Sequence, residues 1–130
     1  MELTVHTDEP IDVVDVTDAV EDAVPADVER GTCLVFVEHT TAGVTINEAE
    51  AGLRSDLRAT LERFAPSDEE YRHDRIDDNA AAHLQATLLG SNVTVPIEDG
   101  TLALGTWQSI LFVDCDGPRS RRLRVTVTAV

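Results

Sequence analysis

The chain is dominated by segments in which apolar and polar residues alternate. Such alternation is typical of half-buried β-strands, because successive side chains of a strand point to opposite faces. Residues 31–39 (GTCLVFVEH) are apolar on both faces, which predicts a strand in the centre of a sheet. The predicted strands comprise residues 2–7, 31–39, 42–47, 92–98, 101–104, 106–114 and 121–130. Close spacing of the last four, with turns at Asp99-Gly100 and at DGPR (116–119), predicts an antiparallel meander.

Helical patterns occupy three other segments. Residues 17–28 predict a short helix capped by Thr17 and stopped near Pro25, and residues 48–64 predict an amphipathic helix. After a polar loop at 65–78, Asp78 is a suitable cap for a helix over 79–89 that ends at Gly90. With a length of 130 residues, the pattern predicts one compact α+β domain over 1–130, with mostly antiparallel sheets and two or three helices.

Charge narrows the classes of partner. The chain has 25 acidic and 10 basic residues, the latter all Arg, and a net charge of -15. Such a surface repels nucleic acid and anionic membranes, and it is typical of adaptation to high salt. The alternative is a calcium-binding surface, but the sequence contains no DxDxDG-type loop that would support it. With neither a signal peptide nor a long apolar segment, the sequence predicts a cytoplasmic protein.

Two cysteines, Cys33 and Cys115, lie far apart in sequence and each within an apolar run. In a cytosolic chain this placement favours small buried apolar residues. A disulfide between them, or a nucleophilic role for one of them, is the less favoured alternative.

Candidate chemistry begins at the ends of two predicted strands. His39 ends the apolar face of residues 31–39, where it is either a structural residue bonded to a carbonyl or a site residue. Arg121 starts the apolar face of the last strand, so its charge needs a partner. That partner is either a structural carboxylate, the commoner case, or a phosphate, which a guanidinium group binds bidentately. Arg119, in the adjoining turn, is a second candidate.

A second group of candidates surrounds the helix at 79–89. His83 lies on a helix face of small and polar residues that leaves room for a ligand, and His73 and Asp74 precede it in the loop. Neutral imidazoles suit zinc, whereas Asp74, Asp78 and Glu48 suit magnesium. The spacing of the histidines matches no standard metal motif, so the sequence leaves the metal open. The fourth histidine, at position 6, is expected at the surface.

Three motifs occur together in this order: EHTTAGVTINE, YRHDRIDDNAAAHLQATLLGSNVTVPIEDG and LGTWQSILFVDCDGPRSRR. Together they resemble the YjbQ-type family, also called the secondary thiamine-phosphate synthase family, from about Gly31 to the C-terminus. The resemblance implies an α+β subunit that assembles as a homotrimer, with sites at the subunit junctions. It also implies a divalent metal bound by the histidines; their imidazoles favour zinc, with magnesium as the alternative. The site residues that it implies are His39, His73, His83, Asn47, Glu48, Asp74, Asp78, Thr106, Trp107, Gln108 and Arg121.

The implied reaction joins an aminopyrimidine methyl diphosphate to a thiazole phosphate and releases pyrophosphate. In this scheme His39, His73, His83, Asp74 and Glu48 are catalytic, and the three histidines hold the metal. Asn47, Gln108, Arg119 and Arg121 bind the small phosphorylated substrate. Trp107 is expected in the core, and Gln108 on the opposite face of the same strand. The alternatives are a metal-assisted phosphate-ester hydrolase and a non-catalytic trimer that binds a metal or a metabolite.

Overall fold

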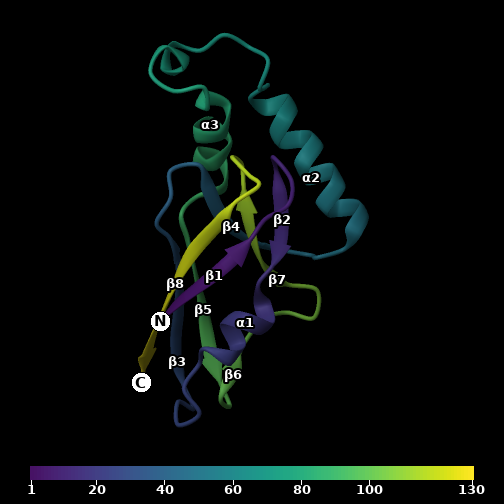
Figure 1. The fold of residues 1–130 in the computed structure, drawn as a ribbon. Coiled ribbons are helices and arrows are strands. Elements are labelled where there is room, and N and C mark those ends of the chain that lie inside the picture. Colours follow the sequence, from purple (N-terminus) through teal and green to yellow (C-terminus); the bar gives the residue numbers. More distant parts are fainter.

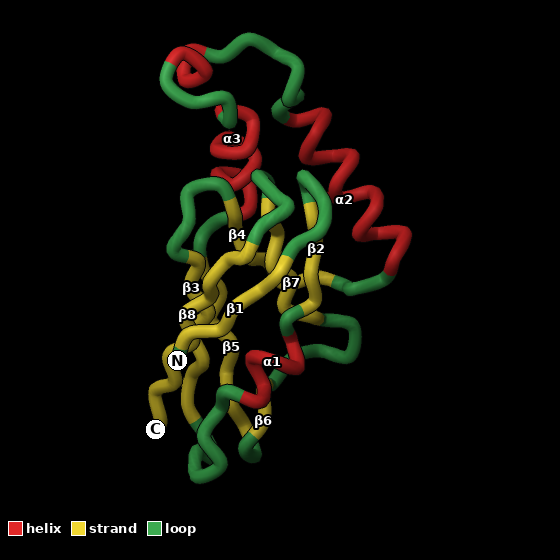
Figure 2. The backbone as a smooth tube through the Cα atoms, viewed as in Figure 1, coloured by secondary structure: helices red, strands yellow, loops and turns green.

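The computed structural model describes all residues, Met1–Val130, as two antiparallel sheets with three α-helices and one 3₁₀ helix (Figures 1 and 2). The first sheet has the order β1 (Glu2–His6), β8 (Ser120–Ala129), β3 (Gly31–Val37), β5 (Asn92–Glu98), β6 (Thr101–Leu102). The second has the order β2 (Asp12–Asp15), β7 (Ser109–Asp114), β4 (Ala42–Asn47). The predicted α+β class is confirmed, and β3 is a central strand as its apolar character indicated.

The three-stranded sheet is buried on both faces. Ile110 and Phe112 of β7 point to a core shared with Val35 and Val95 of the first sheet. The next residue, Leu111, points instead to a smaller core beneath the helices. The helices and the 3₁₀ helix are α1 (Thr17–Asp22), α2 (Ala51–Phe64), η1 (Arg72–Arg75) and α3 (Ala80–Leu89). None of these helices is long and apolar enough to cross a membrane.

The predicted meander is wrong, because β7 and β8 belong to different sheets. β8 pairs with β1 and β3, whereas β7 pairs with β2 and β4. Alternation identifies a strand but not its neighbours, and the connection from Asp114 to Ser120 is long enough to pass between the sheets. Strand β2, over Asp12–Asp15, was not predicted at all, since four residues show too little alternation.

The segment before β7 also differs from its prediction. Residues 106–108 form a turn, and β7 begins only at Ser109. Trp107 is therefore not in the core, and its exposed fraction is 73%. Gln108 closes the turn, where its Oε1 accepts a hydrogen bond from the Gly105 N–H at 2.8 Å.

Helix α1 does not use its predicted cap. Val16 occupies the N-cap position without a side-chain hydrogen bond, and the helix ends at Asp22, before Pro25. The hydroxyl of Thr17 instead donates to Asp15 at 2.6 Å and accepts from the Ile110 N–H at 2.9 Å. Thr17 thus connects α1 to β7 and does not cap the helix.

Helix α3 is also capped differently from the prediction. Asn79, not Asp78, is the N-cap residue, and its side chain makes no cap hydrogen bond. The Ala80 N–H donates instead to the Asp74 carboxylate at 3.2 Å, so the loop supplies the acceptor. At the C-terminal end of α3, Gly90 terminates the helix as predicted, with a φ of 87°.

Both cysteines are free and buried, as the favoured interpretation predicted. Burial raises the pKa of the Cys115 thiol to about 12. Burial, followed by the charge of Glu21, also raises the pKa of Cys33. Both thiols therefore stay protonated at neutral pH and are unsuited to be nucleophiles.

Candidate functional site

Several predicted site residues meet at one end of the two sheets. His39 follows β3, Arg119 precedes β8, and Arg121 is the second residue of β8. His83 lies on α3, which packs against β4 and β7 (Figure 1). They line an open recess of about 530 Å³, which we call the polar recess. Its remaining lining residues are Glu38, Thr40, Thr41, Asp77, Asp78, Asn79 and Asp116, so no hydrophobic residue contributes. Recognition there must rest on charge and hydrogen bonds.

Arg121 forms a buried ion pair with Asp114. Their Nη2 and Oδ1 atoms are 2.8 Å apart, and the side chains are 3% and 0% exposed. The same Nη2 also donates to the Thr41 hydroxyl at 2.7 Å. On the carboxylate, Oδ1 accepts from the Asp116 N–H at 2.9 Å, and Oδ2 accepts from the Thr7 hydroxyl at 2.7 Å. The structural partner expected for the inward-pointing arginine is therefore Asp114.

The guanidinium group of Arg121 is only partly used by this pair. All of its hydrogen bonds are made by Nη2, and Nε is buried without a partner. Nη1 also makes no hydrogen bond within the protein, but unlike Nε it is not fully enclosed. Because Arg121 lines the polar recess, Nη1 is the donor that it offers to a ligand.

Asp114 remains charged in this surrounding. Burial alone would raise its pKa, but hydrogen bonds from Arg121, the Asp116 N–H and Thr7 outweigh burial and hold the pKa below its usual value. A carboxylate whose pKa is lower in the folded state than in the unfolded state stabilises the fold at pH values above its unfolded pKa. This contribution is lost as the pH falls through the folded pKa.

His39 is held as a neutral imidazole. Its Nε2 accepts a hydrogen bond from the Arg122 N–H at 3.1 Å, so the proton lies on Nδ1. Burial lowers the pKa of His39, and the charges of Arg121, Arg122 and Arg119 lower it further, against a smaller opposing effect of Asp114. His39 therefore brings a neutral N–H donor to the polar recess rather than a cation.

This environment predicts a pH-dependent stability. The folded pKa of His39 lies below its unfolded value of about 6.5, so the unfolded chain takes up the proton first as the pH falls. We expect the free energy of unfolding to decrease as the pH falls below the unfolded pKa of about 6.5, until the pH passes the lower folded pKa. Urea unfolding of the wild type and His39→Gln measures the difference; an equal decrease in both would contradict it.

His73 and His83 form a pair of their own. Their rings are 4.6 Å apart between centroids, at 77°. His83 also lines the polar recess, whereas His73 lines a neighbouring surface depression with Tyr71 and Leu84. Asp74 acts mainly on its own loop, where it accepts hydrogen bonds from the Tyr71 and Ala80 N–H groups.

Three predicted site residues lie at the opposite end of the second sheet. Asn47 ends β4 and pairs with Ser109, the first residue of β7, so Asn47, Glu48 and Gln108 are neighbours there. Thr41, beside Arg121, precedes the other end of β4. At about 3.3 Å per residue, a strand of this length separates the two groups by roughly 17 Å. None of these three residues lines the polar recess.

The histidines do not form a metal centre within this chain. No group of three or more His, Cys, Asp or Glu side chains is arranged to hold a metal ion. The Nε2 of His39 is occupied by the Arg122 N–H, and the nearby arginines disfavour a cation. The donor set of a single chain thus does not fit the metal that the resemblance implies, whether zinc or magnesium.

The structure adds residues that the sequence patterns did not indicate. Asp114 and Thr41 complete the arginine pair, although each lies in or beside an apolar run that suggests only a strand. Gln85 is buried in α3, with an exposed fraction of 2%. A polar residue among alanines was the only available signal for Gln85.

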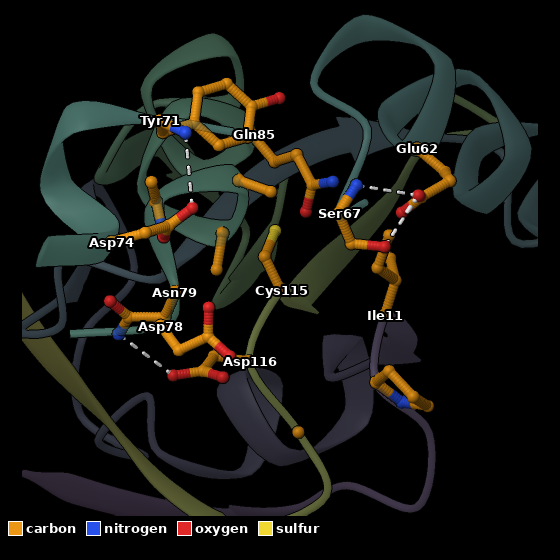
Figure 3. A pocket seen from close by; sticks show the side chains of 15 residues that line it. Ile11, Glu62, Ser67, Tyr71, Asp74, Asp78, Asn79, Gln85, Cys115 and Asp116 are labelled. Atoms are coloured by element: carbon orange, nitrogen blue, oxygen red, sulfur yellow. Dashed lines mark hydrogen bonds between the residues drawn. The ribbon is translucent and has the colours of Figure 1, made fainter. Parts of the chain in front are cut away.

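A second, more enclosed cavity adjoins the recess (Figure 3). It measures about 180 Å³ and lies between α3, the end of α2 and the β7–β8 connection. Asp78, Asn79 and Asp116 line both spaces. The two spaces therefore share this wall.

Comparison with known proteins identifies the family. The family described as UPF0047 protein YjbQ-like matches residues 1–130. A UPF0047 protein of Archaeoglobus fulgidus is 50% identical over 125 residues, covering 96% of this chain and 98% of that protein. A crystal structure from Sulfolobus solfataricus, described as a YbjQ-like protein of unknown function, superposes with a TM-score of 0.96 at 39% identity, covering 100% of this chain and 96% of that one. A hypothetical protein from Aeropyrum pernix also reaches 0.96, at 37% identity, covering 100% and 98%. The chain therefore belongs to the YjbQ-like UPF0047 family.

Proposed function

We propose that this chain is an enzyme that binds a small phosphorylated metabolite in the polar recess. The observation that carries the proposal is the half-used guanidinium group of Arg121, which is 2% exposed and keeps Nη1 free at the recess. Arg119 supplies a second cation, because its backbone is held by Thr7 while its guanidinium forms neither a hydrogen bond nor an ion pair. Two arginines at one wall are well suited to a phosphate or pyrophosphate group.

The proposed reaction is the one that the resemblance to secondary thiamine-phosphate synthases implies. A carbon–oxygen bond of the aminopyrimidine methyl diphosphate breaks, the thiazole nitrogen forms the new carbon–nitrogen bond, and pyrophosphate leaves with the electron pair. Arg119 and Arg121 stabilise the charge that develops on the leaving group. His39 and His83 offer hydrogen-bonding groups in the same recess. No step is assigned to a metal, since the side chains do not assemble a centre for one.

A second candidate is a phosphate-ester hydrolase that uses the same residues. It is favoured by the composition of the polar recess, which has no apolar residue on which a heterocycle could stack. The only tryptophan, Trp107, lies in the turn before β7. Release of inorganic phosphate from a single ester, without a second substrate, distinguishes hydrolysis from transfer.

The homotrimer belongs to the same proposal. Asn47, Glu48 and Gln108 lie at the far end of the second sheet from Arg121. A catalytic site that contains both groups must therefore combine residues of neighbouring copies, as the resemblance implies. Size-exclusion chromatography with light scattering determines the assembly. A monomer that retains activity would contradict a shared site.

Replacing Arg119 by Gln is expected to weaken pyrophosphate binding by about 10- to 150-fold. This range corresponds to the loss of one hydrogen bond to a charged group, about 1.5–3 kcal/mol. Stability should change by less than about 0.5 kcal/mol, because the Arg119 side chain is exposed. Isothermal titration calorimetry with pyrophosphate measures the effect. The control is Arg30→Gln, which lies before β3 at the end opposite His39; equal affinities of both variants would refute the proposed phosphate site.

A further inference from the structure

The cavity next to the polar recess has an unusual polar lining, and we call it the amide cavity after Asn79 and Gln85. It has no Arg or His side chain in its wall. Four carboxylates line it, those of Glu62, Asp74, Asp78 and Asp116. In a chain with a net charge of -15, carboxylates alone indicate nothing about a ligand. The amides are more informative.

Gln85 presents an acceptor to this cavity. Its Nε2 donates to the Ala65 carbonyl at 3.0 Å, and this bond fixes which end of the amide carries the oxygen. Oε1 accepts no hydrogen bond within the protein, and it is not fully enclosed by protein atoms. The side chain is 2% exposed and lines the cavity, so this oxygen is directed to the cavity rather than to bulk water (Figure 3).

Asn79 has a second unpaired amide oxygen, but this oxygen is enclosed and does not open to the cavity. Its Nδ2 donates to Asp116 at 3.3 Å, which leaves Oδ1 as the free end of the amide. Oδ1 is buried and has no hydrogen-bond partner. An acceptor without a partner costs about 1–3 kcal/mol, and a ligand in the cavity can satisfy only the open oxygen, Gln85 Oε1. Adaptation to high salt explains surface carboxylates but not the unpaired Gln85 oxygen at this cavity.

The chemistry of the lining selects a ligand that donates hydrogen bonds and carries positive charge. A metal ion is disfavoured, because no three His, Cys, Asp or Glu side chains converge as ligands. The wall also contains Ile11 and three alanines of α3, which suit a small carbon skeleton. At about 180 Å³ the cavity has room for a few heavy atoms.

We propose that the amide cavity binds a protonated amino or amidinium group of the ligand. Because Asp78, Asn79 and Asp116 line both spaces, the cation would lie next to a phosphate held in the polar recess. The arginines lie at the β8 wall of the recess, away from the cation. The assignment of the phosphate rests on the proposed function, whereas the cation subsite stands on the cavity alone.

Acetamidinium and acetamide are matched probes for this subsite. They have the same size and shape, but only acetamidinium is charged and donates hydrogen bonds from two nitrogen atoms. We expect acetamidinium to shift the side-chain amide resonances of Asn79 and Gln85 and to bind at least about tenfold more tightly than acetamide. Equal binding of the two probes, or no binding of either, would overturn the proposal.

Two variants locate the binding. Glu62→Gln keeps the oxygen that accepts from the Ser67 N–H and hydroxyl but removes the charge at the cavity. Gln85→Met removes Oε1 at similar volume. Each is expected to weaken acetamidinium binding about tenfold while leaving pyrophosphate binding unchanged, since neither residue lines the recess. An unchanged acetamidinium affinity in folded Glu62→Gln would count against the subsite.

Arg119→Gln provides the reciprocal control. Arg119 does not line the amide cavity, so this variant should bind acetamidinium as the wild type does. If acetamidinium binds and pyrophosphate does not, the subsite stands and the proposed function fails. If pyrophosphate binds and acetamidinium does not, the proposed function stands and the subsite fails.

Discussion

Replacing Arg121 by Met is expected to reduce the free energy of unfolding by about 3–5 kcal/mol. The substitution leaves Asp114, which is 0% exposed, without its cationic partner. A buried carboxylate retains its desolvation cost when the compensating charge is removed, which is why breaking a buried pair costs more than the pair contributes. Urea or thermal unfolding at neutral pH measures the change.

Arg124→Met is the matched control on the same strand. Arg124 pairs with Glu38 at the surface, with side chains 53% and 36% exposed, so its loss should cost less than about 1 kcal/mol. Equal costs for the two arginines would contradict a special role for the buried pair.

The cost of Arg121→Met should also depend on pH. Without the arginine, burial dominates and the folded pKa of Asp114 rises, so the variant gains stability relative to the wild type as the pH falls from 7 toward about 4. Adding Asp114→Leu to Arg121→Met should restore much of the loss, because an apolar pair can replace a buried ion pair. A double variant less stable than Arg121→Met would indicate that Asp114 contributes in another way.

Replacing Phe112 by Ala is expected to cost about 3–5 kcal/mol, the usual range for a buried aromatic residue. Phe112 lies in the middle of β7, between Val14 and Val44 of the flanking strands, and is 0% exposed. It fills the core between the two sheets, so truncation leaves a cavity that neither sheet can close. Calorimetric unfolding is the direct measurement.

Phe36→Ala is the same chemical change on an exposed face. Phe36 is 38% exposed on β3, and we expect its truncation to cost much less than that of Phe112. A similar cost at both positions would contradict the two-sheet core. Since β7 also ends at Asp114, a loosened Phe112 variant should bind pyrophosphate more weakly at temperatures near its transition.

The sequence alone determined the local elements and the chemistry of several positions. Alternation in GTCLVFVEH placed a central strand and left His39 at its end. The period of β8 put Arg121 on the inner face and Arg122 and Arg124 on the outer one, so the strand pattern by itself required a partner for the Arg121 charge. Gly90 and the Asp99-Gly100 turn were equally readable, because a positive φ limits which residues fit.

Only the tertiary structure decided which of these positions meet. Local periodicity contains no information on pairing, so the separation of β7 from β8 into two sheets was unpredictable. That separation makes Asp114 the partner of Arg121 and places Asn47, Glu48 and Gln108 at the other end of the second sheet. The unpaired oxygens of Asn79 and Gln85 likewise arise from packing, since a hydrogen bond depends on the position of atoms distant in sequence. Side-chain type is a property of the chain, whereas proximity is a property of the fold.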